Sequence, residues 1–289
     1  MSAPGDNIIH RGEPSRTALH VARLRAVHAL LDEPIVLDDP VALPLLGAEA
    51  AALRDDPFVC NDPMSRGLRA TLVARSRVAE DELARRVAKG LRQYVVLGAG
   101  LDTFAARNVH AARGLRVFEV DHPSTQRWKR EALQAAGLEV GDTAFVPLNL
   151  ERDDLMQGLR AAGLRTDQPV FIAWLGVTLY LTPEAVWKTL SAVATLPPGS
   201  GIAFDYRVPA EQLNPLERAL HDMVAQQIAA IGEPWLSAFD PTALQRQLQE
   251  MGFAHIEDVG GGELNQRFFA GRKDGLRTGN VVRIMCAGR

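Results

Sequence analysis

Short apolar runs that alternate with amphipathic stretches constrain the fold of this chain more than any other feature. Each run is four to six residues long, and they lie at 94–97, 115–120, 143–147, 170–174, 201–205, 255–259 and 281–286. Helical patterns follow each of the first five runs, which predicts an α/β fold with a mostly parallel sheet covered on both faces. The last two runs predict a closing hairpin that makes one of seven strands antiparallel.

Two helical segments precede the first strand and have no strand partner of their own. They lie at 17–31 and 68–89, and between them the segment 38–63 is broken by four prolines. We therefore expect residues 1–90 to form an N-terminal helical cap over a core at 91–289. Within that core, an inserted helix is expected at 211–232, before the last two strands.

The composition is that of an ordinary folded protein, with 47% hydrophobic and 23% charged residues. A net charge of -3 gives no strong field for nucleic acid, and no apolar stretch approaches the roughly 18 residues of a membrane span. Cys60 and Cys286 lie far apart, outside any metal-binding spacing. We expect a cytoplasmic protein that uses no metal and acts on neither nucleic acid nor membrane.

A glycine turn follows directly on the first predicted strand. Gly98 and Gly100 stand in the sequence Val95-Val96-Leu97-Gly98-Ala99-Gly100-Leu101-Asp102-Thr103. Glycines at the carboxyl end of a first parallel strand let the backbone approach a ligand, and the pattern continues into a predicted helix. The third glycine of the dinucleotide motif is absent, so the turn indicates a nucleotide-like ligand in general. The alternative is a tight turn with no ligand.

A carboxylate ends the second predicted strand, where a ribose would lie in a nucleotide-binding crevice. Glu119 and Asp121 fall on the same side of this strand because side chains alternate with a period of two, so either could accept from the ribose hydroxyls. The alternative is that Asp121 only caps the helix that starts at Pro123.

Four blocks of sequence together resemble the leucine carboxyl methyltransferase-like family. They are Arg75-Ser76-Arg77, the glycine turn at 95–103, residues 119–123, and Trp174-Leu175-Gly176-Val177-Thr178-Leu179-Tyr180-Leu181. The resemblance extends from about residue 17 to the C-terminus. The family includes bacterial S-adenosylmethionine-dependent methyltransferases and some polyketide O-methyltransferases. It implies a Rossmann-like class I methyltransferase fold, a catalytic core at 91–289 and S-adenosyl-L-methionine as cofactor.

The resemblance also implies roles for single residues. Gly98 and Gly100 would border the methionine part of the cofactor, and Asp121 would hold the ribose hydroxyls. Arg75 would pair with the cofactor carboxylate, a role that suits a planar bidentate donor. Weaker candidates for the same role are Arg25 and Arg77.

Three further positions are expected near the cofactor, two of them departures from the family pattern. Asn149 and Leu150 fall beside the adenine, and Asn149 stands where the family usually has an acidic residue. Its amide carbonyl can still accept from the adenine amino group. Leu175 replaces a Glu found in some members, including the leucine carboxyl enzymes themselves, which argues against a protein C-terminus as the acceptor.

On the acceptor side, Tyr180 and Tyr206 follow the fourth and fifth strands and are expected to line a pocket for a small molecule, with core packing as the alternative. The histidines show no recognisable triad, so no catalytic base is assigned. The expected activity is O-methylation of a carboxylate or hydroxyl. Two other functions stay open: a nicotinamide-dependent oxidoreductase and a noncatalytic interaction protein that retains the fold.

Overall fold

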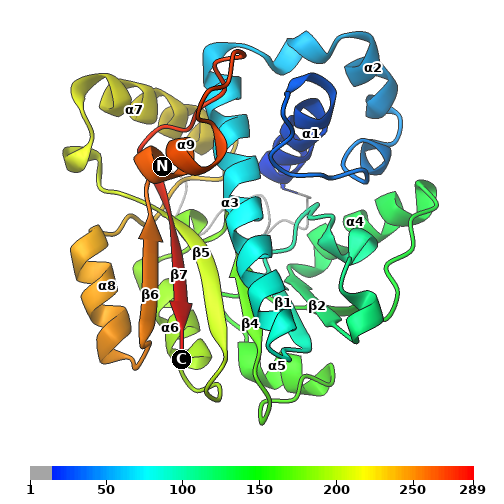
Figure 1. Ribbon diagram of the computed structural model, residues 1–289, viewed down its shortest axis with the longest axis vertical. Helices are drawn as coiled ribbons and strands as arrows, with labels where there is room; N and C mark the ends of the chain where they lie inside the picture. The colour runs from blue at the N-terminus through cyan, green and yellow to red at the C-terminus, as the bar shows by residue number, and fades with distance from the viewer. Residues whose placement is uncertain (1–14) are drawn as a thin grey trace.

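A single seven-stranded sheet organises the protein, and the computed structural model describes it within residues 15–289. The strand order is β3-β2-β1-β4-β5-β7-β6 (Figure 1). The strands are β1 (Gln93–Leu97), β2 (Arg116–Asp121), β3 (Ala144–Pro147), β4 (Phe171–Trp174), β5 (Gly201–Arg207), β6 (His255–Val259) and β7 (Val282–Gly288). Strand β7 runs antiparallel to both of its neighbours, and the other pairings are parallel. The predicted mostly parallel sheet with an antiparallel strand is confirmed.

The helices lie between and before these strands. They are α1 (Arg16–Leu31), α2 (Glu49–Asp55), α3 (Pro63–Ala88), α4 (Pro123–Ala135), α5 (Leu155–Ala161), α6 (Pro183–Val193), α7 (Pro215–Ala230), α8 (Pro241–Glu250) and α9 (Gly261–Phe268). Several begin with Pro after an Asp, Asn or Thr cap. Asp240, for example, accepts from the Ala243 amide at 2.8 Å and precedes Pro241 at the first position of α8.

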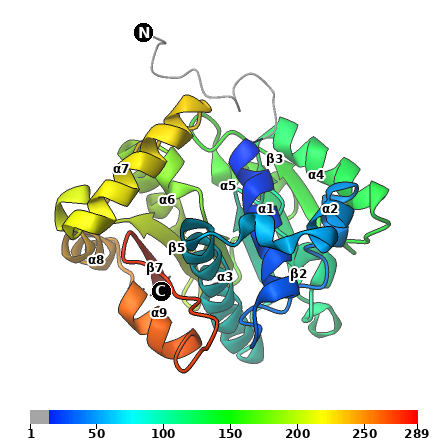
Figure 2. The ribbon, with the colours of Figure 1, turned by 90° about the horizontal axis from the view of Figure 1, so that it is seen from above.

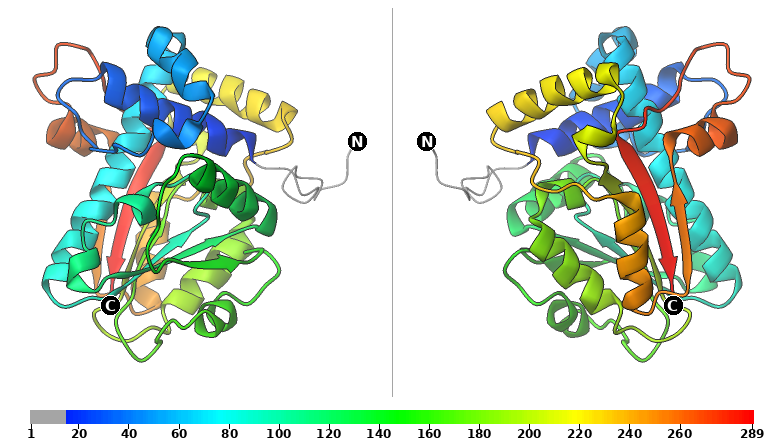
Figure 3. Two further views of the ribbon diagram at one scale, coloured as in Figure 1. Left: turned by 90° about the vertical axis from the view of Figure 1, so that its right-hand side faces the viewer. Right: turned by 90° about the vertical axis from the view of Figure 1, so that its left-hand side faces the viewer.

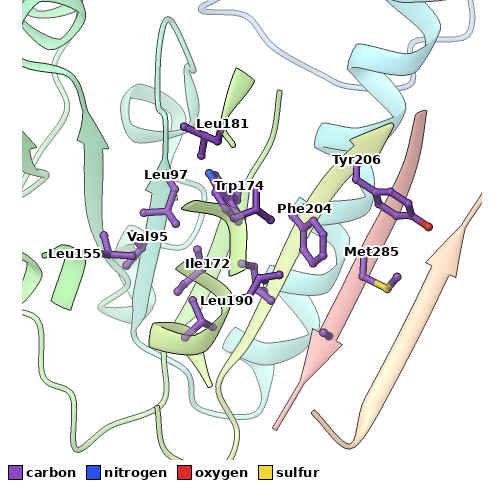
Figure 4. Packing of buried hydrophobic residues seen from close by; sticks show 14 of the residues in the cluster. Val95, Leu97, Leu155, Ile172, Trp174, Leu181, Leu190, Phe204, Tyr206 and Met285 are labelled. Atoms are coloured by element: carbon purple, nitrogen blue, oxygen red, sulfur yellow. The ribbon is translucent and has the colours of Figure 1, made fainter. Parts of the chain in front are cut away.

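Both faces of the sheet are buried, and the alternation of side chains along β1 shows it. Val95 and Leu97 join a cluster with residues of α5, α6 and α8, part of which Figure 4 shows. Tyr94 and Val96 join a second cluster with residues of α3 and α9 on the opposite face. The nearly continuous apolar strands follow from this double burial.

The segment after β1 differs from the prediction, because it contains no α-helix. Two short 3-10 helices, η4 (Phe104–Arg107) and η5 (Ala111–Arg113), take its place. The Asp102 carboxylate accepts from the Phe104 amide at 2.8 Å, and the Asn108 carbonyl accepts from the His110 amide at 3.0 Å. Such local side-chain bonds to backbone amides compete with α-helical bonding.

Helices α1, α2 and α7 lie across the end of the sheet at which the parallel strands finish (Figures 1 and 3). Seen from above, α1 and α7 flank this end on two sides (Figure 2). The start of α3 belongs to the same layer, whereas Leu83 and Val87 of its second half pack against the sheet. The segment before residue 90 thus caps the sheet and also covers one of its faces. In the part of the chain at 15–289, no helix has both the length and the apolar character needed to cross a membrane.

Candidate cofactor and acceptor site

A cavity of about 600 Å³ lies where the parallel strands end, beneath α1, the start of α3, and α7. This volume falls in the usual range of small-molecule sites, roughly 300–1,000 Å³. The cavity brings together most of the site residues expected from sequence. Those that line it are Arg75, Gly98, Gly100, Asp121, Asn149, Leu150, Leu175 and Tyr180.

Contacts within the protein fix the conformation of the glycine turn. Gly98 has a φ of +65°, and a Cβ at this position would lie 2.3 Å from a methyl carbon of Val177. The Gly98 amide donates to the Val120 carbonyl at 2.8 Å. The turn therefore fits closely between the ends of β2 and β4, and only glycine tolerates both the space and the backbone conformation.

Of the two carboxylates considered for the ribose, Asp121 is the one that lines the cavity. Its Oδ2 accepts from the Gly100 amide at 2.5 Å and its Oδ1 from the His122 amide at 2.6 Å, which fixes it beside the turn. Burial raises its pKa, and the two amide bonds partly oppose the shift. His122, not Asp121, caps α4 by accepting from the Ser124 amide.

Glu119, the other carboxylate considered for the ribose, lies deeper in the strand and is fully buried. Its Oε2 lies 2.6 Å from the Lys129 ammonium on α4. Burial, the largest influence, raises the pKa of Glu119, and the lysine opposes that shift. Between the two candidates, the structure leaves Asp121 as the one that lines the cavity.

Arg75 is held at the cavity wall by a buried carboxylate that sequence reasoning missed. Its Nη1 donates to Asp205 Oδ2 at 2.7 Å, and the other oxygen of Asp205 accepts from the Gly176 amide at 2.5 Å. The guanidinium lies so close to Gly176 that a Cβ there would be 2.6 Å from Nη2. Asp205 thus orients Arg75 and neutralises part of its charge.

The other two candidate arginines have partners of their own. Arg25 also lines the cavity, but its guanidinium donates to Asp39 at 2.6 Å and to Asp102 at 3.1 Å. Arg77 is exposed, pairs with Asp81 at 2.8 Å and does not line the cavity. Arg75 is therefore the best placed of the three for a ligand carboxylate.

Asn149, which is expected beside the adenine, already makes two hydrogen bonds within the protein. Its side-chain carbonyl accepts from the Glu151 backbone amide at 3.0 Å, and its backbone N–H donates to the Asp153 carboxylate at 2.8 Å. A carbonyl oxygen accepts two bonds, so one more donor can still reach it. Leu150 and Leu175 supply apolar surface in the same cavity.

Tyr206 does not line the cavity, so its expected contact with the acceptor is corrected here. Side chains alternate along β5, and Tyr206 therefore points to the opposite face from Asp205, among the residues in Figure 4. Its hydroxyl donates to Asp258 at 2.9 Å. Tyr180 does line the cavity, and burial raises the pKa of its phenol.

The same alternation brings Arg207 into the cavity, together with His221 of α7 and Trp235. Arg207 Nη1 bonds to His221 Nε2, and its guanidinium carbon lies 4.7 Å from the centre of the Trp235 ring. Sequence reasoning missed this group. The period-two step from Asp205 to Arg207 was the signal for the arginine, whereas only the folded chain brings His221 and Trp235 beside it.

Comparison with known proteins places this site in a family. The model of the family described as leucine carboxyl methyltransferase matches residues 18–194. YktD of Bacillus subtilis, whose name assigns it to the S-adenosyl-L-methionine-dependent methyltransferases, is 31% identical over 305 residues, covering 96% of this chain and 99% of YktD. A relative from Mycolicibacterium smegmatis whose name makes the same assignment is 34% identical over 237 residues, covering 76% and 73% of the two chains.

A solved structure shows the same fold at low sequence identity. The crystal structure of a protein from Thermobifida fusca, titled as a methyltransferase, superimposes with a TM-score of 0.59 and 18% identity, covering 100% of this chain and 99% of that one. The oxidoreductase and the noncatalytic protein considered above do not accord with these relatives. The chain belongs to the leucine carboxyl methyltransferase family and is an S-adenosylmethionine-dependent methyltransferase.

Proposed function

We propose that this protein transfers the methyl group of S-adenosylmethionine to a carboxylate or hydroxyl oxygen of a small organic acceptor. Polyketide-type metabolites are the acceptors that the resemblance to O-methyltransferases suggests. One observation carries the proposal: a single cavity is lined by the residues expected around the cofactor and also by Tyr180, Arg207 and Trp235.

The residues of the cavity fit the chemical parts of the cofactor. Arg75, oriented by Asp205, offers a guanidinium to the carboxylate of the methionine part. Asp121 offers carboxylate oxygens to the ribose hydroxyls, and Asn149 has a lone pair left for the adenine amino group. These roles are proposals that rest on placement and on the family resemblance.

The cofactor supplies an electrophilic methyl carbon on a positively charged sulfur, and the protein has to hold an acceptor oxygen behind that carbon. Such positioning contributes roughly 7 to 11 kcal/mol in favourable cases. A carboxylate is ionised at neutral pH and needs no proton removed, whereas a phenol benefits from a base. Residues of α1 and α7 line the cavity, where they would exclude water from the transfer.

Calorimetry with S-adenosylmethionine and with NADH tests the cofactor end of the proposal. The wild type should bind the first only, and Asp121→Ala should weaken that binding by about 1 to 3 kcal/mol because the ribose loses its acceptor. Asp167→Ala, at an exposed carboxylate that pairs with Arg165, serves as the matched control and should bind normally. Binding of NADH alone, or equal affinity in the two variants, would reject these assignments.

The acceptor is tested with methyl-labelled cofactor and a panel of carboxylic acids, phenols, alcohols, amines and thiols. Labelled products that release methanol in mild alkali are esters, and alkali-stable products are ethers, so the product identifies the receiving oxygen. Label transferred only to nitrogen or sulfur nucleophiles would refute O-methylation.

A further inference from the structure

Arg207 is a buried cation that no carboxylate neutralises within residues 15–289. Its relative exposure is 9%, and burial lowers its pKa, because removing the charge from water costs free energy. The buried arginines elsewhere differ: Arg69 pairs with Asp32, and Arg25 pairs with Asp39. A buried charge without a counter-ion is costly to maintain, so its persistence in a cavity points to a ligand that supplies the opposite charge.

The bonds that hold Arg207 are all to neutral groups. Its Nε and Nη2 donate to the Ser237 carbonyl at 3.3 and 3.1 Å, and Nη1 donates to His221 Nε2. Since arginine can only donate, His221 Nε2 is the acceptor and Nδ1 carries the proton, which it donates to Asp222 at 2.9 Å. Three of the five guanidinium N–H groups are thus used, and two are left for a ligand.

Carboxylates that line the same cavity have other partners, and two of them, Glu80 and Asp102, pair with Arg107 and Arg25. Asp205 is bound to Arg75, and Asp121 accepts from two backbone amides. Glu233 accepts from the Arg16 amide at 2.9 Å and from the Ser15 hydroxyl at 3.2 Å, at the start of α1. The charge of Arg207 is therefore available to a bound molecule.

The position of Arg207 places that molecule at the acceptor end. Arg207 lies two residues beyond Asp205 on the same face of β5, a separation of about 7 Å along the strand. Asp205 holds the arginine proposed for the cofactor, so the second guanidinium lies further along the cavity. The cavity that contains Arg207 is also lined by apolar side chains, among them Leu179, Leu220, Val224, Ile228 and Val281, with Gln227 and Glu233 as polar neighbours in the lining.

We propose that Arg207 binds a carboxylate of the methyl acceptor and thereby determines which acceptors the protein selects. This inference rests on the proposed function, which it deepens by assigning a charge and a shape to the acceptor. One positive charge and two remaining N–H donors match a planar monoanion, and a phosphate dianion would leave one charge uncompensated against the apolar wall. The acceptor is thus a carboxylic acid with an apolar body, held through that acid group.

Binding measurements test the proposal without relying on turnover. Octanoate and benzoate, with octanol and benzyl alcohol as neutral analogues, are titrated by calorimetry into protein saturated with S-adenosylhomocysteine. The wild type should bind the acids at least tenfold more tightly than the alcohols. Arg207→Met should abolish this preference through a roughly 10- to 100-fold loss in affinity for the acids, and Arg207→Lys should restore part of it.

A matched variant at another arginine distinguishes recognition of the acid by Arg207 from a general effect of removing one positive charge from the protein. Arg218 lies on the exposed side of α7 and donates to the Ala210 carbonyl, outside the cavity. Arg218→Met should keep the preference for acids, and Arg207→Met should bind S-adenosylmethionine as tightly as the wild type does.

Equal binding of acids and alcohols to the wild type overturns the proposal, as does a preference that survives Arg207→Met. Loss of S-adenosylmethionine binding in Arg207→Met also overturns it, since the arginine would then act through the structure of the whole cavity. Failure of the wild type to bind S-adenosylmethionine is a different result, which counts against the proposed function itself.

Discussion

Substitution of Gly98 by Ala tests whether the glycine turn is required by its contact with Val177. A Cβ at residue 98 would lie 2.3 Å from Val177 Cγ2 and 3.2 Å from Cγ1. The first distance is far below van der Waals contact, and overpacking of this kind costs about 1–3 kcal/mol. The φ of +65° adds about 1–2 kcal/mol for a residue with a side chain. We therefore expect Gly98→Ala to lower the free energy of unfolding by about 2–5 kcal/mol.

Two further variants divide this cost into its parts. Gly100→Ala keeps the backbone strain, with a φ of +46°, but its Cβ would make only ordinary van der Waals contacts, with the Ala18 Cβ at 3.5 Å and the Gly98 carbonyl oxygen at 4.0 Å, so the loss should be about 1–2 kcal/mol. Val177→Ala removes both clashing methyl groups, so the double variant with Gly98→Ala should recover the overpacking part. Urea unfolding of the wild type, Gly98→Ala, Val177→Ala and the double variant gives a double-mutant cycle with an expected coupling of about 1–3 kcal/mol. A coupling near zero would refute the argument.

The remaining predictions concern charged groups around the cavity and in the core. Arg75→Lys should weaken S-adenosylmethionine binding about tenfold in calorimetry, because an ammonium cannot bridge Asp205 and a ligand carboxylate with a planar fork; unchanged affinity would count against Arg75 as the partner. Because burial raises the pKa of Asp121, wild-type affinity for the cofactor should fall on acidification at a higher pH than for an ordinary carboxylate; a pH profile shared by Asp121→Asn would contradict this. Lys129→Met should cost about 3–5 kcal/mol near pH 8, because it leaves Glu119 buried without its cation. A buried carboxyl with a raised pKa is most stable when protonated, so this loss should shrink toward pH 5 in urea unfolding, and a loss that grows would refute the reasoning.

The sheet could be predicted from sequence because both of its faces are buried. Runs such as 170–174 are apolar throughout, and β4 forms within that run as expected. The interval after β1 was mispredicted because Asp102 and Asn108 hold the backbone through local bonds that a helical pattern does not reveal. The dual role of α3, as part of the cap and as a cover for the sheet, was also missed, since it depends on how far the helix extends over the strands.

The site residues that stand directly after a predicted strand could be predicted from sequence. Gly98, Gly100 and Asp121 stand at the ends of adjacent strands, and parallel pairing brings such positions together. For Tyr206 the alternative of core packing holds, because the alternation along β5 turns Tyr206 away from the cavity and Arg207 toward it. The ion pair between Arg75 and Asp205 spans 130 positions of sequence, so only the fold reveals it.

We propose that one ligand, the cofactor, lies against the glycine turn, Asp121 and Arg75 together. A crystal structure of the protein with S-adenosylhomocysteine tests it most directly. We expect the ligand carboxylate at Arg75, the ribose hydroxyls at Asp121 and the sulfur facing Tyr180 and Arg207 within the same cavity. A ligand bound outside this cavity, or one whose ribose and carboxylate contact neither residue, would contradict it.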